Sequence, residues 1–564
     1  MTILFLRIGA IAIDLIASAS LIVAVAIVWG LSGTFHIGPW LASVTSPRNP
    51  VVIGACALVI RSFDADTPFL GFLTISALRR RALAASARFH DALVALTLER
   101  AIPLLFGVLA ASLALKLILA GSHPGFWTGD DVEIHEMTFA KLFGYGWPAH
   151  EFRSPFFPLG FIYPVQALLV KLGQGDPARL VFAGRTVVAM FTIATLWLTF
   201  HVARVVFGSI PIAALTVLIL ATNKLHVMTG TTELPRPVAS LFVLAAFGLL
   251  STSRRESAAC AAGALITVAA AMRFSEGVFV IPAVAQLVIA RRWRGVLMFG
   301  LGVATVGAVA FGAVDFAYWG EPFFSARNIW ELTLIRRLST RGFQPWYEYV
   351  RAIPSWTNIA VAAFAVYGTI KLRLWTLGIW AWVPVVLLSL LPHKEPRYLV
   401  PILPYFAMLA SAGLWHSIVW LQQSSAPLGA DRRERAALPL VMTVFTVFLT
   451  EPMDYVLPRS DDGIAVARYI AAHGPTDGVL AEPAWNIGGR IYLPLANPLL
   501  DVDFEQMRER SKMDAMIRTP SLAWLVLQNH DVQCLQYESL ITAAGFNAIT
   551  LPGNSSTYRT YHRR

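Results

Sequence analysis

Long apolar stretches separated by short polar turns run along the chain from about residue 4 to about residue 453. An α-helix needs about 20 mostly apolar residues to cross a bilayer. The pattern therefore predicts an α-helical polytopic membrane protein with about 11–13 transmembrane helices. The predicted spans lie near residues 4–30, 50–62, 101–120, 179–202, 209–226, 237–251, 257–272, 277–290, 297–318, 358–371, 374–391, 398–420 and 437–453.

The pattern changes after about residue 454. Polar helical stretches such as DGIAVARYIAAHG alternate there with short apolar runs such as DGVLAE and AWLVLQ. Alternation of helix and strand is typical of an α/β fold, so residues 454–564 are predicted to form a small α/β extramembrane domain. Ahead of it we expect extra N-terminal helices with a cytoplasmic linker in residues 1–100 and the main membrane module in residues 101–453.

Composition supports a membrane protein. The 564 residues are 56% hydrophobic and only 14% charged, with a mean hydropathy of +0.61, whereas a soluble domain is about a quarter charged. The net charge of +11 comes from short basic clusters between apolar runs, without a basic stripe carrying interleaved aromatic residues, so no nucleic acid partner is expected. The three cysteines form no CxxC pair, which argues against a disulfide framework or a thiolate metal site.

The basic clusters give the predicted topology. They all fall on one side of the span map, which the positive-inside rule makes cytoplasmic: residues 79–81, 254–255, 291–294, 371–373 and 431–435. The opposite, external side then holds the first loop, the Arg273 turn, residues 319–357, the HKEPR turn and the tail. The short stretch 160–173 is interpreted as an interfacial helix within the first external loop, residues 121–178. High alanine and low lysine content favours a bacterial inner membrane, with the external side in the periplasm.

The first external loop carries the densest acidic pattern, DDVEIHE. Asp130 and Asp131 suit a helix N-terminus, and a solvated acidic face is the simplest interpretation. Paired carboxylates also suit general-base chemistry, because burial and like charge raise the pKa of one of them. A third interpretation is a divalent-metal site built from Asp130, Glu133 and either His135 or Glu136.

Other charged pairs lie on the same predicted side. Glu151 and Arg153 follow in HEFRSP, Glu233 and Arg236 precede a helix that begins with proline, and Arg273 lies in a short turn. Each pair alone fits an interfacial salt bridge or a snorkelling side chain. Several such pairs on one face favour a binding site for a phosphate or a sugar.

The stretch HKEPRYLVPILPY gives the sharpest signal. His393, Lys394 and Arg397 could together neutralise a phosphate, and Glu395 could fix their geometry. The alternative is a polar turn whose cations reach lipid headgroups, but these cations lie on the side that the positive-inside bias disfavours.

The segment 319–357 is rich in aromatic and basic residues. Arg336 and Arg337 also oppose the charge bias, which favours an anionic partner such as a lipid phosphate. Its aromatic residues fit an interfacial belt or stacking on sugar rings, and the sequence does not separate these roles.

Together these motifs resemble the GT-C glycosyltransferases, and within them the mannosyltransferases of glycosyltransferase family 22. The resemblance covers roughly residues 101–420, and its most specific motif is HKEPRYL, where the family has His-Lys-Glu-x-Arg-Phe. It implies a GT-C fold and an inverting transfer of a sugar, commonly mannose, from a polyprenyl-phosphate donor to a glycan or glycolipid acceptor outside the cytoplasm. Asp130 matches the family acid, and Asp131 stands where the family usually has Glu. Lys394 and Arg397 would stabilise the leaving phosphate, so a divalent metal is compatible with the mechanism but not demanded, and no cofactor is expected.

Two alternative functions remain open at this stage. A glycolipid transporter or flippase should show pseudo-repeated halves and charges near the membrane midplane, whereas the charges here collect at one face. An enzyme like the O-antigen ligases would use lipid-diphosphate donors and external Arg and His residues without an acidic pair in the first loop.

Overall fold

The computed structural model describes most of the membrane module and parts of both flanks. The described residues are 33–37, 40–44, 95–122, 126, 129–144, 153–336, 344–423, 462–473, 478–481, 489–493, 499–501, 510–528, 532–549 and 558–563. The spans predicted at 4–30, 50–62 and 437–453 lie outside these residues. Between the first two of them, β1 (Gly33–Ile37) and β2 (Trp40–Val44) form an antiparallel hairpin.

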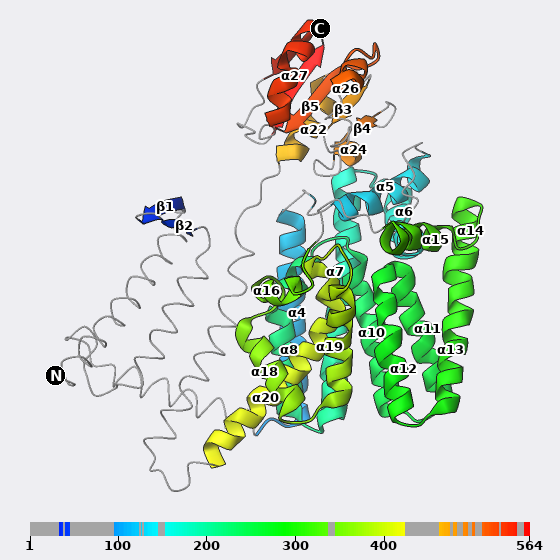
Figure 1. Cartoon of the computed structure of the whole chain (residues 1–564), viewed down its shortest axis with the longest axis vertical. Coiled ribbons are helices and arrows are strands. Elements are labelled where there is room, and N and C mark those ends of the chain that lie inside the picture. Colours follow the sequence, from blue (N-terminus) through cyan, green and yellow to red (C-terminus); the bar gives the residue numbers. More distant parts are fainter. Residues whose placement is uncertain are drawn as a thin grey trace, which may run out of the picture.

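Helices form the membrane module, and the predicted spans that fall within the described residues coincide with helices (Figure 1). Five helical segments of the described part are long and apolar enough to cross a membrane: Leu98–Ser122 (α4), Pro177–Phe207 (α7), Pro235–Thr252 (α10), Trp293–Trp319 (α13 to α14) and Pro396–Ser417 (η5 and most of α20). Shorter apolar helices stand beside them: Ile210–Thr222 (α8), Glu256–Met272 (α11), Phe274–Ile289 (η2 and α12), Ile359–Ile370 (α18) and Trp375–Ser389 (α19). The structure thus confirms a helical membrane protein.

Local sequence signals set the ends of these helices. Asp176 caps the N-terminus of α7 by accepting a hydrogen bond from the backbone N–H of Arg179 at 3.1 Å, and Pro177 occupies the first helical position. Gly208 ends the helix in the left-handed conformation with a φ of 60°, which costs glycine no steric penalty.

Small residues bring neighbouring helices into close contact. A Cβ atom added at Gly263 of α11 would lie 2.1 Å from the Phe299 carbonyl oxygen of α13. One added at Gly302 of α13 would lie 2.0 Å from the Cys260 carbonyl oxygen of α11. The two backbones therefore touch directly, the packing that membrane helices achieve with glycine.

Charged residues lie in turns at both ends of the helical bundle, with the basic turns at one end and the acids of the first loop at the other. At one end, the Arg292 guanidinium donates to the backbone carbonyls of Ser253 and Arg255, which joins two of the basic turns. Helix α11 runs from this end to Arg273, which lies 3.5 Å from Asp130 of the first loop at the opposite end. The division of charge expected from the sequence is therefore present in the described turns.

Short helices assemble at the end that carries Asp130, which we call the first-loop end. From the first loop come α5 (Gly129–Phe143), η1 (Pro158–Ile162) and α6 (Tyr163–Lys171), where an interfacial helix was predicted. The other short elements of the described chain are α9 (Lys224–Thr229), α15 (Phe324–Trp330), η4 (Glu331–Ile335), α16 (Glu348–Arg351) and α17 (Ile353–Trp356). Figure 1 shows α5 and α6 at the upper end of the bundle, below the C-terminal domain.

The C-terminal residues form the predicted small α/β domain. Its five-stranded sheet has the order β4-β3-β5-β7-β6, in which β3 runs parallel to β4 and β5 whereas β7 runs antiparallel to β5 and β6. The strands are β3 (Val479–Ala481), β4 (Leu499–Asp501), β5 (Trp524–Gln528), β6 (Phe546–Ile549) and β7 (Tyr558–Arg563). The helices are α22 (Asp462–His473), α24 (Gly489–Tyr492), α26 (Arg510–Ile517) and α27 (Val532–Ala543).

Candidate active site

Asp130 lies at the centre of a group of arginines that the sequence places far apart. It occupies the first turn of α5 and pairs with Arg153, with Arg273 at 3.5 Å and with Arg397 at 3.0 Å. Burial alone would raise the pKa of Asp130, but the charges of Arg153, Arg397 and Arg236 outweigh it and hold this pKa well below its usual range. Asp130 is therefore a permanent anion at neutral pH.

Asp131 has the opposite electrostatic character. Its side chain is fully buried, and burial raises its pKa to about 7. Burial is the largest cause of this shift; the charges of Glu233 and Asp130 act in the same direction, and those of Arg397 and Arg185 oppose it. A carboxylate with a pKa near neutrality can accept a proton at working pH and release it again, as a general base must.

Glu233 anchors the side of the site next to Asp131. It accepts a hydrogen bond from Arg185 Nε at 2.7 Å and lies 3.0 Å from His135 Nε2. The Gln166 amide donates to His135 Nδ1 at 3.0 Å, so the imidazole presents its Nε2–H to Glu233. Arg185 also donates to the Ala120 carbonyl at 3.1 Å. This network ties α5, α6, α7 and α4 together around one buried carboxylate.

Arg236 provides a buried guanidinium next to Asp130. It is 1% exposed, its Nε lies 3.6 Å from Glu276, and its central carbon lies 4.1 Å from the centre of the Tyr398 ring. None of its three nitrogen atoms has a hydrogen-bond partner among the described residues. A buried guanidinium with unused donors is costly unless another group supplies acceptors, and a phosphate has the matching geometry.

The side chains of the HKEPR turn have two kinds of partner: some contact charged residues of the site, and Lys394 contacts backbone carbonyls. Arg397 pairs with both Asp130 and Glu395, and His393 Nε2 lies 3.5 Å from Glu395. Glu395 therefore fixes the geometry of its cationic neighbours, as the sequence suggested, and Arg397 reaches the site.

Lys394 has a different environment. Its ammonium donates to the backbone carbonyls of Gln344 at 2.9 Å and Leu391 at 2.5 Å, and its side chain is nearly buried. Its backbone N–H donates to the Gln344 side chain at 2.8 Å. In this arrangement Lys394 ties the turn to the segment around residue 344, and its ammonium faces backbone carbonyls.

Five other predicted residues complete the set. Lys394 faces backbone carbonyls, and His393 lies beside Glu395. Arg336 forms an exposed pair with Glu331 and is not brought to Asp130. Arg337 and Glu151 lie outside the described residues. The structure therefore brings together Asp130, Asp131, Arg153, Glu233, Arg236, Arg273, Glu395 and Arg397.

The first-loop residues weighed as metal ligands are engaged by other side chains. Asp130 and Glu133 both pair with Arg153, whereas His135 is directed to Glu233. Within the part of the chain that the structure describes, no three His, Cys, Asp or Glu side chains gather into a group able to hold a metal ion.

Sequence reasoning missed Arg185 and did not assign Glu276 to the site. Arg185 lies within the apolar stretch predicted as the span 179–202, where a single arginine near one end is easily interpreted as snorkelling to the interface. Its 4% exposure and its pairing with Glu233 identify it as an interior residue. A charged residue inside a predicted span was the available signal.

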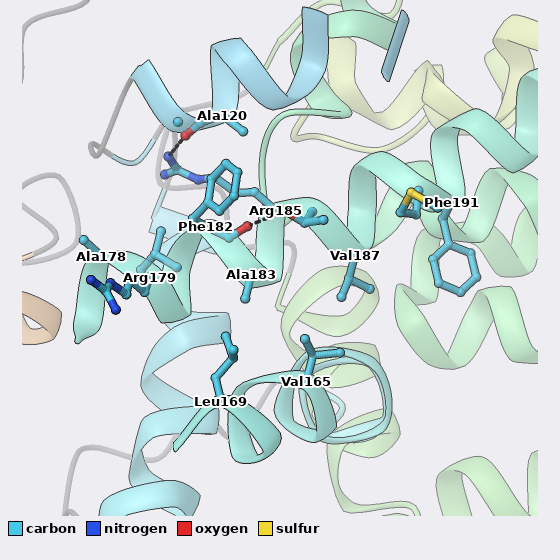
Figure 2. Close-up of a pocket in the computed structure, with 14 residues that line it drawn as sticks. Ala120, Val165, Leu169, Ala178, Arg179, Phe182, Ala183, Arg185, Val187 and Phe191 are labelled. Atoms are coloured by element: carbon cyan, nitrogen blue, oxygen red, sulfur yellow. Dashed lines mark hydrogen bonds between the residues drawn. The ribbon is translucent and has the colours of Figure 1, made fainter. Parts of the chain in front are cut away.

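An apolar groove of about 770 Å³ adjoins the Glu233 side of the site. The end of α4, helix α6 and the first turns of α7 line it (Figure 2). Val165, Leu169 and Phe182 are among the apolar side chains around it, and Arg185 extends from the groove to the Ala120 carbonyl. The groove can accommodate a hydrocarbon chain beside the buried charges.

The chain has measurable similarity to known proteins. The model of the Alg9-like mannosyltransferase family matches residues 131–457, more than half of the chain. No curated protein sequence matches it. The fold is similar to ArnT from Cupriavidus metallidurans, a GT-C glycosyltransferase, in a crystal structure bound to undecaprenyl phosphate, with 15% identity, a TM-score of 0.56 and coverage of 80% of this chain and 97% of ArnT. The apo ArnT structure gives 15% identity, a TM-score of 0.56 and coverage of 82% and 98%. The arabinofuranosyltransferase AftD from Mycobacteria matches at 14% identity with a TM-score of 0.49, over 80% of this chain and 39% of AftD.

The family match contains most of the residues that the structure brings together, from Asp131 to Arg397. The likeness to ArnT shows that the helical module has the GT-C fold, as the sequence motifs suggested. The chain belongs to the Alg9-like mannosyltransferase family and is a membrane glycosyltransferase that takes its sugar from a lipid-linked donor.

Proposed function

We propose that the protein transfers mannose from a polyprenyl-phosphate mannose donor to a glycan or glycolipid acceptor, with inversion at the anomeric carbon. The family match supports mannose as the sugar. The undecaprenyl phosphate bound to ArnT supports a polyprenyl phosphate as the carrier.

The observation that carries this proposal is the unequal environment of two adjacent acids. Arginines surround Asp130 and hold it ionised, whereas Asp131 is buried beside Glu233 and has a pKa of about 7. One side of the first turn of α5 is therefore suited to an anionic leaving group, and the other to deprotonation of a hydroxyl.

The reaction follows from this division. The Asp131 carboxylate takes the proton of an acceptor hydroxyl while the hydroxyl oxygen forms a bond to the anomeric carbon of the donor. The bond from that carbon to the phosphate oxygen breaks on the opposite face, and its electron pair leaves with the polyprenyl phosphate. The proton remains on Asp131 until it is released to solvent. A single displacement of this kind inverts the configuration.

The arginines would stabilise the leaving phosphate. Arg236 has donors without partners in the described structure, and Arg273 and Arg397 both contact Oδ2 of Asp130, with Arg397 also paired to Glu395. A phosphate entering beside Asp130 would meet these three guanidinium groups, each suited to bidentate contacts. Because they neutralise the phosphate, the mechanism requires neither a divalent metal nor another cofactor.

We further propose that the first-loop end faces the periplasm of a bacterial inner membrane. The basic turns at Ser253–Arg255 and Arg291–Arg292 lie at the opposite end, where the positive-inside rule favours the cytoplasm. The apolar groove beside Arg185 would then open near the external leaflet, where it supports a substrate with a hydrocarbon chain.

The direct test uses the purified full-length protein in lipid nanodiscs with tritiated undecaprenyl-phosphate mannose and octyl α-mannoside as a synthetic acceptor. The expected result is a disaccharide glycolipid with the configuration opposite to that of the donor. Turnover of a lipid-diphosphate sugar, with the monophosphate donor left unused, would contradict the proposal and favour a ligase-like enzyme.

Sidedness has its own test in a variant without Cys56, Cys260 and Cys534. A cysteine at exposed Glu321 should react with a membrane-impermeant maleimide added to intact spheroplasts, and one at exposed Arg254 should react only after lysis. The reverse labelling pattern would place the first-loop end in the cytoplasm.

A further inference from the structure

The C-terminal domain contacts the helix that carries the two acids. Ile491 of α24 is fully buried in an apolar cluster with Val132 and Phe139 of α5 and with Leu180 and Val181 of α7. The buried isoleucine therefore packs directly on α5, where one of its partners, Val132, follows Asp131 in the sequence. Ile491 lies outside residues 131–457, the part of the chain that the family model matches, whereas the α5 and α7 residues that it contacts lie within it.

Next to Ile491, two aromatic rings flanked by two arginines lead from the C-terminal domain into the membrane module. Arg468 of α22 lies 5.5 Å from the ring centre of Tyr492. The Tyr492 and Phe126 rings are 6.4 Å apart, and Arg185 lies 5.6 Å from the Phe126 ring. Distances of this size are typical of aromatic pairs and cation–π contacts. Four residues from four segments thus form a continuous series.

This series ends on the residues that surround Asp131. Phe126 lies edge-on to the His135 ring, with 5.7 Å between ring centres. Arg185 and His135 are the two side chains that hold Glu233, at 2.7 and 3.0 Å. Phe126 therefore contacts both partners of the buried carboxylate and is itself contacted by Tyr492.

The electrostatics of Tyr492 agree with this position. Burial raises the pKa of its phenol to about 12, the charge of Arg185 opposes the increase, and the charge of Glu233 adds to it. Tyr492 therefore remains protonated at neutral pH, and its ring makes the contacts described above.

We propose that the C-terminal domain is a working part of the glycosyltransferase, with Tyr492 as a positioning residue for the acceptor side of the site. Tyr492 holds the Phe126 ring against Arg185 and His135, and these two residues fix Glu233 beside Asp131. The assignment of an acceptor side rests on the proposed function, whereas the contact between α24 and α5 does not. Because α24 follows the family-matched region, the family match itself does not account for this contact.

The kinetic test compares Tyr492→Ala with Tyr492→Phe in the full-length protein, with undecaprenyl-phosphate mannose as donor and octyl α-mannoside as acceptor. The alanine variant should lose about tenfold in kcat, because small displacements of catalytic groups are costly, while the donor KM stays within about twofold. The phenylalanine variant should retain nearly full activity, since the ring makes the contacts. Equal loss in both variants, or no loss in either, would overturn the proposal.

Tyr469→Ala is the matched control. Tyr469 lies on α22 in the same domain and packs on the domain's own core beside Trp524, 6.3 Å between ring centres. If general destabilisation of the domain caused the loss of activity, Tyr469→Ala would reproduce it. A normal kcat in this variant is the expected result.

Hydrogen exchange gives a measurement that needs no substrate. Tyr492→Ala should increase deuterium uptake in the peptide covering α5, residues 129–143, and Tyr469→Ala should not. Unchanged exchange of α5 in Tyr492→Ala would show that α24 does not hold this helix. If the wild-type protein transfers no mannose while Tyr492→Ala still increases the deuterium uptake of α5, the proposed function is refuted. The contact between α24 and α5 is then still supported.

Discussion

Arg397 Nη1 lies 3.0 Å from Asp130 Oδ2, although the two residues are separated by more than 260 positions in the sequence. The same arginine pairs with Glu395, two residues before it, so its guanidinium is shared between the late turn and the first loop. This bridge brings a cation of the HKEPR turn against the first-loop acids. Asp130 and Asp131 also have different environments, because Asp130 is paired with three arginines whereas Asp131 is fully buried near Glu233.

The first prediction concerns Asp131→Asn and Asp130→Asn. Asp131→Asn removes the proposed base and should lower kcat by about a hundredfold or more, with the donor KM little changed. Asp130→Asn leaves the base in place but releases its arginines, so the donor KM should change more than kcat. Steady-state transfer rates at varied donor concentration measure both constants. A larger kcat loss for Asp130→Asn than for Asp131→Asn would reverse the two roles.

The second prediction is the pH dependence of the rate. A general base must be ionised in the free enzyme, and burial raises the pKa of Asp131 to about 7. The ratio kcat/KM should therefore fall as the pH decreases through about 7, with a slope that corresponds to one proton. A rate that stays constant down to about pH 5 would mean that a group with an ordinary carboxyl pKa, near 4, is the base.

The third prediction is that Asp131 lowers stability while it serves activity. Its pKa is about 7 in the folded protein against 3.8 as an ordinary carboxyl, so folding becomes less favourable as the pH rises between these values. Asp131→Asn should accordingly raise the midpoint of thermal unfolding at about pH 8 and raise it much less at about pH 4. An equal change at both pH values would show that ionisation of Asp131 is not involved.

The sequence predicted the helices well because apolar stretches of membrane length have few other structures available. The α/β tail was also predicted, since runs such as AWLVLQ alternate with polar helices and become β5 and its neighbours. The convergence of Asp130 with Arg273 and Arg397 followed from charge bias alone, which places turns on one side of a membrane.

The sequence could not distinguish which charged side chains enter the site. Lys394 and Arg397 lie three residues apart in one turn, yet one donates to backbone carbonyls and the other reaches Asp130. The difference depends on where the segment around Gln344 packs, which is a long-range contact. The division of labour between Asp130 and Asp131 likewise depends on Glu233, a residue about a hundred positions away.

The fourth prediction compares two arginines in different environments. Arg236 is buried with unused donors, and Arg336 forms an exposed pair with Glu331. Arg236→Met should raise the donor KM by about tenfold to a hundredfold, because charge-assisted hydrogen bonds to the phosphate would be lost. Arg336→Met should change it by about twofold at most, since exposed ion pairs contribute little. Equal effects would move the phosphate site toward the segment at residues 331–336.

The last prediction separates two roles for Lys394. Its ammonium donates to the Gln344 and Leu391 carbonyls, and its backbone N–H donates to the Gln344 side chain. If the lysine ties this segment to the turn, Lys394→Met should leave two half-buried carbonyls without their donor and lower the midpoint of thermal unfolding. The donor KM of the remaining folded enzyme should then stay within about twofold of wild type.

If Lys394 instead binds the donor phosphate, the pattern of effects reverses. Lys394→Met would then raise the donor KM by about tenfold or more while the unfolding midpoint stays constant, because the fold would not depend on the ammonium. Gln344→Ala decides between the two roles, since it removes the side chain that accepts from the Lys394 N–H without removing any charge. We expect Gln344→Ala to lower the unfolding midpoint in the same direction as Lys394→Met. If Gln344→Ala has a normal unfolding midpoint and Lys394→Met has a raised donor KM, Lys394 belongs to the phosphate site, as the HKEPR motif predicted.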